Sequence, residues 1–279
     1  MPGAVRALGG VGGHIGAPHV NRRRALGQHF LRDAGIARAI VDLVGPTASD
    51  LVVEIGPGEG ALTHELVRRA GRVVALEVDR GLIEALRRRW PGVEVLEADA
   101  RTWEYGLLQR PPGGRVLVAG NLPYSVGKPI VAALLEARAA IDTMALMLQR
   151  EVAERLAAPP GGKVYGALSV LTQAVCDVEL ALRVPPGAFR PPPKVDSAVV
   201  RLTPRPRGRV PPELEARFRD VVRAAFASRR KTLANALTGG LGLSLGVVRA
   251  AAAGCGVDPA RRAETLTIEE FIGLTARLP

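Results

Sequence analysis

Four consecutive residues, Asn121-Leu122-Pro123-Tyr124, combine groups that can hold and stack an aromatic amine. They follow the apolar run 115–120, which predicts a buried strand. Ligands of open α/β sheets bind at the carboxyl ends of strands. The amide oxygen of Asn121 and a backbone carbonyl of Leu122 or Pro123 can accept both hydrogens of an exocyclic amino group, while Tyr124 stacks on the ring. This tetrad therefore predicts a site for an adenine amino group.

A glycine-rich turn predicts where the group that reacts with this amine binds. The apolar run 51–55 leads into the turn 56–60, of sequence GPGEG, and 61–70 looks helical. Enzymes that bind dinucleotides use the spacing GxGxxG to seat a pyrophosphate, whereas this turn has GxGxG and follows Glu54. A carboxylate is unfavourable beside a pyrophosphate but suits a cationic ligand such as S-adenosylmethionine (SAM).

Two further acids stand at the ends of the next predicted strands. Glu77 ends the run 72–77, about 20 residues after the turn, where Rossmann-like sites bind ribose hydroxyls. Asp99 follows the run 93–97 and can accept a hydrogen bond from the amino group of a cofactor adenine. Taken singly, Glu77 could be a solvated strand end, Asp99 a helix cap and the tetrad a tight turn. Their order, each after a predicted strand, favours one ligand site.

The strands and helices that must position these groups alternate along the chain. Strands are expected at 51–55, 72–77, 93–97, 115–120 and 143–149. Helices are expected at 61–70, 80–90, 127–140 and 150–157. This alternation predicts an α/β fold whose parallel sheet has helices on both faces. Two more strand-like runs follow at 178–184 and 197–203. The Pro-rich segment 204–212 is expected to be a linker, and 213–279 has helical periodicity.

Composition excludes several classes of protein. The chain has 279 residues, 47% of them hydrophobic, which favours one large and one small domain. No apolar stretch is long enough to span a bilayer, and 1–20 lacks the pattern of a secretory signal, so we expect a flexible leader there. The two cysteines, Cys176 and Cys255, and the four histidines do not have the spacing of metal ligands. We therefore expect no metal, and two reduced, buried thiols in a cytosolic protein.

The charge indicates a nucleic-acid partner. The formal net charge is +11, and only four of the 38 basic residues are Lys. Arginine stacks on bases and binds phosphate with two parallel bonds, which suits RNA, although genomic base composition is an alternative explanation. The cluster 87–89 closes a predicted helix and is assigned to structure. Two other clusters are predicted to bind RNA phosphates: Arg22, Arg23, Arg24, Arg229, Arg230 and Lys231.

One aromatic residue has two interpretations. The Pro-dense segment 185–194 is stiff and could hold Phe189 as a wall of the site. Phe189 could equally be a core residue beneath a loop, and the sequence does not separate these alternatives.

In this order, the motifs resemble the KsgA/RsmA family, the small-subunit (16S) rRNA adenine N6-dimethyltransferases, and their eukaryotic and mitochondrial relatives. The resemblance covers nearly everything after Arg22 and is carried by LGQHFL at 26–31, EIGPGEGALT at 54–63, EVD at 77–79, EADA at 97–100, the tetrad, QREVAERL at 149–156, 189–197 and 226–233. Two positions depart from the common pattern. His29 stands where bacterial members often carry Asn, and Glu59, expected to be exposed, stands where Leu is common.

The resemblance implies a SAM-dependent methyltransferase domain over 21–203, with a mostly parallel sheet and one reversed strand, and a small helical domain over 213–279. It implies double methylation of two adjacent adenosines in the 3′-terminal hairpin loop of 16S rRNA, in the cytoplasm, on immature 30S particles. A monomer is the default. Carried over by motif, SAM would contact His29, Leu31, Gly56, Gly58, Glu77, Asp99, Ala100 and Asn121.

The catalytic residues expected are the tetrad and Phe189. The amino nitrogen of adenine is a poor nucleophile, so acceptors on its hydrogens would favour a pyramidal nitrogen, and positioning would supply most of the acceleration. After one methylation a single hydrogen remains on the nitrogen. We expect that Leu122, rather than a second Pro at this position, leaves room for the methyl group.

Three alternatives remain. A large-subunit rRNA methyltransferase of the antibiotic-resistance type would share the fold and an Asn-x-Pro-Tyr motif. The runs 189–197 and 229–232 favour the small-subunit enzyme, and a DNA adenine methyltransferase usually has other variants of the tetrad. A ribosome-assembly factor that binds RNA without needing the chemistry is the third.

Overall fold

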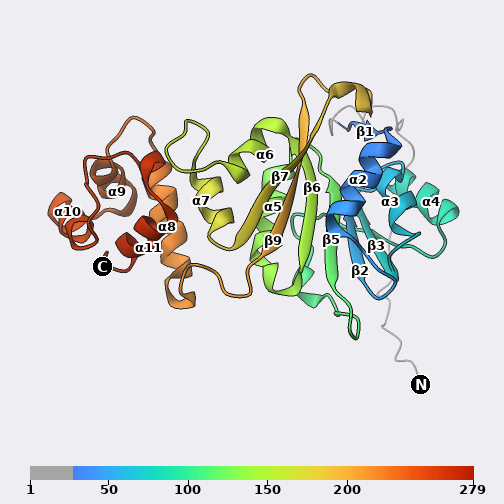
Figure 1. Cartoon of the computed structure of the whole chain (residues 1–279), viewed down its shortest axis with the longest axis horizontal. Coiled ribbons are helices and arrows are strands. Elements are labelled where there is room, and N and C mark those ends of the chain that lie inside the picture. The colour runs from blue at the N-terminus through green and yellow to red at the C-terminus, as the bar shows by residue number, and fades with distance from the viewer. Residues whose placement is uncertain (1–27) are drawn as a thin grey trace, which may run out of the picture.

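The computed structural model describes residues 28–279, and their main sheet has seven strands in the order β4-β3-β2-β5-β6-β9-β7 (Figure 1). The strands are β2 (Leu51–Ile55), β3 (Arg72–Glu77), β4 (Glu94–Glu97), β5 (Val116–Asn121), β6 (Thr143–Gln149), β7 (Cys176–Val184) and β9 (Ser197–Pro204). β9 runs antiparallel to both of its neighbours, and the other neighbouring strands pair in parallel. The predicted parallel sheet with one reversed strand is confirmed. The expected leader 1–20 and Arg22-Arg23-Arg24 lie outside the described residues.

Central strands are apolar along their length because helices cover both faces. In β2, Val52 and Val53 are both 0% exposed but belong to different core clusters. The cluster around Val52 contains residues of α2 (Ala34–Val44), α3 (Ala61–Leu66) and α4 (Arg80–Arg89). The cluster around Val53 contains residues of α5 (Gly127–Glu136) and α6 (Arg150–Ala157).

Two helices are shorter than the sequence predicts. α3 ends at Leu66 rather than at residue 70, because the chain must pass close to the loop before β2: a Cβ on Gly71 would lie 2.1 Å from the carbonyl oxygen of Ala48. α5 ends at Glu136 rather than at residue 140 and is followed by a 3₁₀ turn, because the chain must reverse direction before β6.

A small second sheet joins the start of the described chain to the Pro-dense segment. β1 (Phe30–Leu31) pairs antiparallel with β8 (Phe189–Arg190), and Leu31 lies opposite Phe189. The sequence did not predict this sheet, nor α2 and α7 (Ala167–Gln173).

The C-terminal part is helical, as predicted, and comprises α8 (Glu215–Phe226), α9 (Leu233–Leu241), α10 (Leu245–Gly254) and α11 (Ile268–Thr275). Thr267 and Glu270 form a reciprocal capping box at the start of α11. The helical core also includes Tyr165 and Val170, which precede the expected linker. The division into domains at 203 and 213 therefore stays a prediction. Between residues 28 and 279, none of the helices has the length and apolarity needed to cross a bilayer.

Candidate active site

A pocket opens at the carboxyl ends of the central strands and has an empty volume of about 1130 Å³ including its mouth. Its lining includes the whole tetrad and every residue predicted to contact a cofactor: His29, Leu31, Gly56, Gly58, Glu77, Asp99, Ala100 and Asn121. Segments nearly a hundred residues apart therefore meet in one pocket, because parallel strands end at the same edge of a sheet.

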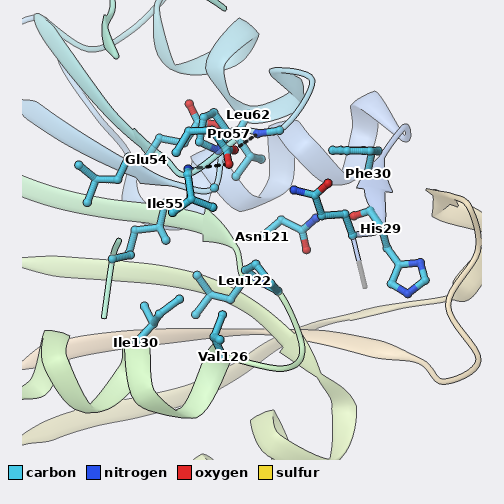
Figure 2. A pocket seen from close by; sticks show the side chains of 18 of the residues that line it. His29, Phe30, Glu54, Ile55, Pro57, Leu62, Asn121, Leu122, Val126 and Ile130 are labelled. Atoms are coloured by element: carbon cyan, nitrogen blue, oxygen red, sulfur yellow. Dashed lines mark hydrogen bonds between the residues drawn. The ribbon is translucent and has the colours of Figure 1, made fainter. Parts of the chain in front are cut away.

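The amide of Asn121 is oriented by the backbone of His29. Its Nδ2 donates a hydrogen bond of 3.0 Å to the carbonyl oxygen of His29, and Figure 2 shows Asn121 between Leu122 and His29. This bond uses one of the two N–H groups of Nδ2 and fixes the orientation of the amide. Oδ1 is left available to a ligand, and this oxygen can only accept.

The ring of His29 is held in turn by the Pro-dense segment. Its Nδ1 lies 2.8 Å from the carbonyl oxygen of Pro191, and a carbonyl only accepts, so Nδ1 carries the proton. The ring of Tyr124 lies with its centroid 5.5 Å from that of His29. The Tyr124 hydroxyl lies 2.5 Å from Ser197 Oγ, and burial raises the pKa of this phenol, so it stays neutral at pH 7.

Leu122 is fixed by both its backbone and its side chain. Its N–H donates to the carbonyl oxygen of Met147 at 3.0 Å, and its side chain, 1% exposed, forms part of the pocket wall. The next carbonyl groups of the tetrad follow this anchored residue, so their positions depend on the pairing of β5 with β6.

Glu77 ties the glycine-rich turn to the end of β3. Its carboxylate accepts hydrogen bonds from the backbone N–H groups of Val78 at 2.9 Å, Asp79 at 3.1 Å and Gly58 at 3.3 Å. Burial nonetheless raises the pKa of Glu77. The turn itself requires glycine, since φ is 62° at Gly56 and 57° at Gly58. A Cβ on Gly58 would lie 2.9 Å from the ring of Phe30, which covers the turn.

Glu54 is buried in the pocket wall with half of its carboxylate unsatisfied. Oε2 accepts a bond of 2.7 Å from the hydroxyl of Thr63, whereas Oε1 has no partner among residues 28–279. Burial raises the pKa of Glu54 to about 7, and the charge of Glu77 adds to this effect. A buried acceptor without a partner is unfavourable, so a cationic ligand would be stabilised here. Thr63 was not predicted from the sequence; its place on the first turn of α3 was the only signal.

Asp99 is bound by an arginine that the sequence analysis also missed. Arg101 Nη2 lies 2.5 Å from Asp99 Oδ2, and the Arg101 N–H donates to Oδ1 at 2.9 Å. The hydrogen bonds from the Arg101 side chain lower the pKa of Asp99 and keep it ionised. Arg101 also lines the pocket, so a ligand that bonds Asp99 shares this carboxylate with Arg101.

The structure does not place Phe189 in the pocket, contrary to its predicted role as a wall. Phe189 is 4% exposed and belongs to the core cluster that contains Leu31 and Val184. The register of β1 with β8, which sets Leu31 opposite Phe189, directs the ring into this core. The alternative position, a core residue beneath a loop, is the one observed.

The predicted basic cluster that the structure describes lies on the loop between α8 and α9. Arg229, Arg230 and Lys231 are exposed, and Arg229 Nη2 donates to the carbonyl oxygen of Lys163 at 2.8 Å. Arg87-Arg88-Arg89 form the last turn of α4, as predicted.

Cys176 is buried as expected, whereas Cys255 is only half-buried. Among residues 28–279 no three His, Cys, Asp or Glu side chains are grouped to hold a metal.

A family model described as ribosomal RNA adenine dimethylase matches residues 19–278 of this chain. The chain belongs to this family. The Ribosomal RNA small subunit methyltransferase A of Geobacter sulfurreducens is 45% identical over 267 residues, which cover 93% of this chain and 96% of that protein.

Solved structures of the same kind agree. The crystal structure of 23S rRNA methyltransferase ErmE superposes with a TM-score of 0.69 at 30% identity, over 89% of this chain and 99% of that one. A dimethyladenosine transferase from Plasmodium falciparum has a TM-score of 0.71 at 25% identity, over 88% and 96%. Because the rRNA adenine dimethylases are methyltransferases that use SAM, this protein is a SAM-dependent methyltransferase.

The residues of the pocket fit SAM. The unpartnered Oε1 of Glu54 is a buried acceptor for a cationic group, and the glycine turn allows close approach of a ligand. Four carboxylates line the pocket, those of Glu54, Glu59, Glu77 and Asp99. They match the donors of a cofactor that carries positive charge and ribose hydroxyls.

Proposed function

We propose that this protein dimethylates the N6 amino groups of two adjacent adenosines in the 3′-terminal hairpin loop of 16S rRNA during maturation of the small subunit. The observation that carries this proposal is the orientation of Asn121, whose Nδ2 is bonded to His29 and whose Oδ1 is therefore an acceptor. The name and 45% identity of the Geobacter relative support small-subunit rRNA as the substrate.

The chemistry follows from these positions. SAM, when bound, would supply an activated methyl group on a sulfonium. Glu77, Asp99 and Ala100 would hold its nucleoside part, and Asn121 and Gly56 the remainder. The target adenine must leave its stack to reach the pocket, and Tyr124 stacks on it. Asn121 Oδ1 and a carbonyl of Leu122 or Pro123 would accept the amino hydrogens and so make the nitrogen lone pair available for methylation. The nitrogen would take the methyl group from the sulfonium and lose a proton to water.

The second methylation needs space where the first had a hydrogen. Leu122 lines the pocket, and we expect its side chain to border this position. A flexible leucine there accommodates the methyl group of N6-methyladenosine, and the remaining N–H keeps one acceptor.

Large-subunit rRNA is a second candidate substrate, because ErmE covers 89% of this chain at 30% identity. The run from Phe189 to Ser197 and the run from Arg229 to Thr232 favour the small subunit. Incubation of the protein with labelled SAM and either immature 30S or 50S particles separates the two. Label in 16S rRNA supports the proposal, and label only in 23S rRNA overturns it.

We further propose that the protein acts as a cytoplasmic monomer without a metal on immature 30S particles, with a methyltransferase domain over 21–203 and a helical domain over 213–279. A role in assembly beyond catalysis is tested with Asn121→Ala: a variant that binds immature 30S particles without methylating them has such a role. Phe189, in its core position, contributes by supporting β1, which carries Phe30 and Leu31 into the pocket.

A further inference from the structure

The four lysines of this chain share an unusual set of properties. Lys128, Lys163, Lys194 and Lys231 stand among 38 basic residues, all the others being Arg. Each of the four is exposed. Within residues 28–279, none of them forms an ion pair with a carboxylate.

Many arginines, by contrast, pair with carboxylates at both edges of the sheet. At the carboxyl ends of the strands, Arg80 pairs with Glu97 at 2.8 Å and Arg150 with Asp196 at 2.9 Å. At the amino ends of the strands, Arg72 pairs with Glu94 at 2.6 Å and Arg115 with Asp50 at 2.7 Å. Arg110 pairs there with Asp142 at 2.5 Å. Carboxylates therefore neutralise part of the arginine charge at both edges, whereas the four lysines remain available to a polyanion.

Two of the lysines are close in the chain to residues that line the pocket or contact its lining: Lys128 follows Val126 by two positions, and Lys194 precedes Ser197, which contacts Tyr124. Lys128 is in the first turn of α5, which follows the tetrad directly. A cation is unfavourable at the amino end of a helix, so helix stability does not explain this residue. Lys194 lies between β8 and β9 on a segment tied to the site at both ends, by Pro191 to His29 and by Ser197 to Tyr124.

The other two lie on neighbouring loops farther along the same edge. The bond of Arg229 Nη2 to the carbonyl oxygen of Lys163 joins the loop between α6 and α7 to the loop between α8 and α9, which carries Lys231. In Figure 1 these two loops and the turn before β9 follow one another along the upper edge of the molecule.

We propose that Lys128, Lys194, Lys163 and Lys231 mark the path of the RNA backbone, from the phosphates beside the target adenosine at the pocket to the phosphates of the helix that continues towards α9. This inference rests on the proposed RNA substrate and adds Lys128, Lys163 and Lys194 to the predicted cluster. A lysine ammonium binds phosphate as a mobile point charge, and each such contact releases counterions.

Because the chain has only four lysines, one labelling experiment reports on the whole path. The full-length protein is acetylated at neutral pH, alone and bound to the ribosomal particle that the wild type methylates, with an added lysine peptide as a dose reference. Mass spectrometry then gives the reactivity of each lysine. We expect at least a five-fold loss at all four positions. The path would be overturned if Lys128 and Lys194, the two lysines near the pocket, kept the acetylation reactivity that they have in the free protein.

Salt dependence separates contact from mere shielding. Binding of an RNA stem-loop with two adjacent adenosines in its loop is measured over a range of salt. Lys194→Ala and Lys163→Ala are each expected to lower the slope of log affinity against log salt by about 0.7 to 0.9. Lys194→Arg restores the slope, and Arg72→Ala, at the opposite edge, leaves it unchanged. An unchanged slope in Lys194→Ala and Lys163→Ala contradicts the proposal.

The two proposals fail in different ways. Absence of methyl transfer by the wild type to 30S particles contradicts the proposed substrate, and the lysine path is then tested on the 50S particle. The lysine variants are also checked for thermal stabilisation by SAM, which the proposed path leaves unchanged, because a loss there would indicate misfolding rather than a lost phosphate contact. Methylated 30S particles that leave the lysines unprotected contradict the path alone.

Discussion

The side chain of Asn121 and the backbone of His29 are joined by a hydrogen bond of 3.0 Å between residues 92 positions apart. β1, which pairs with β8, follows His29 directly, and Asn121 ends β5, so the bond connects the small sheet to the main one. It also leaves Oδ1 of the amide available to accept a hydrogen bond. In the proposed function, catalysis therefore depends on a contact made by a segment that is not part of the main sheet.

Replacing Asn121 with Ala removes the acceptor for one amino hydrogen and the link to His29. We expect the single-turnover rate of methyl transfer to fall by about 100-fold or more, by analogy with the loss of one preorganised hydrogen-bonding partner of a transition state. Rapid-quench measurement with labelled SAM gives this rate. Asn121→Asp keeps an acceptor but not the donor to His29, and a rate equal to that of wild type would contradict the assigned orientation.

Tyr124 is expected to act through its ring rather than its hydroxyl. Tyr124→Phe loses the bond to Ser197 but keeps stacking, so its catalytic efficiency should stay within a few-fold of wild type. Tyr124→Ala loses the stacked base, worth about 1–3 kcal/mol, and should fall by roughly 10-fold to 100-fold in kcat/KM. Steady-state kinetics on the same RNA compares the two variants, and similar losses in both would assign the role to the hydroxyl.

The raised pKa of Glu54 is expected to make the free energy of unfolding depend on pH. Its pKa is raised from 4.5 to about 7 by burial, so the unfolded chain loses this proton first and stability falls as pH rises from about 4.5 to 7. For Glu54 alone the fall is on the order of 3 kcal/mol. Glu54→Gln should flatten the free energy of unfolding between pH 5 and 8, as measured with urea.

A cationic ligand should reverse this effect. SAM is expected to raise the melting temperature of the wild type more at pH 8 than at pH 5, and that of Glu54→Gln about equally at both. Glu84→Gln, which changes an exposed carboxylate of α4 outside the pocket lining, serves as the control. A wild-type response to SAM that does not change with pH would contradict the assignment of Glu54 to the cationic group.

Leu122 is expected to control the second methylation. A proline there would also remove the N–H that donates to Met147, so Leu122→Ile, which keeps that bond but is branched at Cβ, is the sharper test. We expect the ratio of dimethyladenosine to monomethyladenosine to fall several-fold in single-turnover reactions, with little change in the first methylation. A normal yield of dimethyladenosine from Leu122→Ile, and from Leu122→Pro if it folds, would remove this role.

Asp50 supports the site from the opposite end of the sheet. Burial opposes its charge, but bonds from Arg115 and Thr47 hold the pKa of Asp50 well below its usual range. Asp50→Ala should lower the free energy of unfolding by about 2–3 kcal/mol, less than for a fully buried pair because Arg115 is 43% exposed. Asp42→Ala, which breaks the exposed pair with Arg69, should cost less than about 1 kcal/mol. Equal losses in urea unfolding would contradict this account.

The centre of the main sheet was predictable because its strands are apolar on both faces. The run 51–55 coincides with β2, and 143–149 with β6. The sites at strand ends followed from this, since Glu77 and Asn121 end β3 and β5. The small sheet of β1 and β8 was not predictable, because two-residue strands have no periodicity and pair across more than 150 residues.

The errors at the site have the same origin. The position of Phe189 depends on which residue of β1 lies opposite, and a register between distant segments leaves no local pattern. Arg101 and Thr63 act through side-chain bonds to Asp99 and Glu54, and their residue types are common on any surface or helix. The sequence therefore predicted residues that line the pocket but not Arg101 and Thr63, which form hydrogen bonds with two of its carboxylates.

The most direct test of the proposed function is the nucleoside composition of small-subunit rRNA after reaction. Immature 30S particles are incubated with this protein and labelled SAM, and fragments of the 16S rRNA are analysed by mass spectrometry. The account predicts N6,N6-dimethyladenosine at two adjacent positions of the 3′-terminal hairpin loop, and none with Asn121→Ala. Unmodified 16S rRNA in particles that bind the wild-type protein, or dimethyladenosine confined to 23S rRNA, would contradict it.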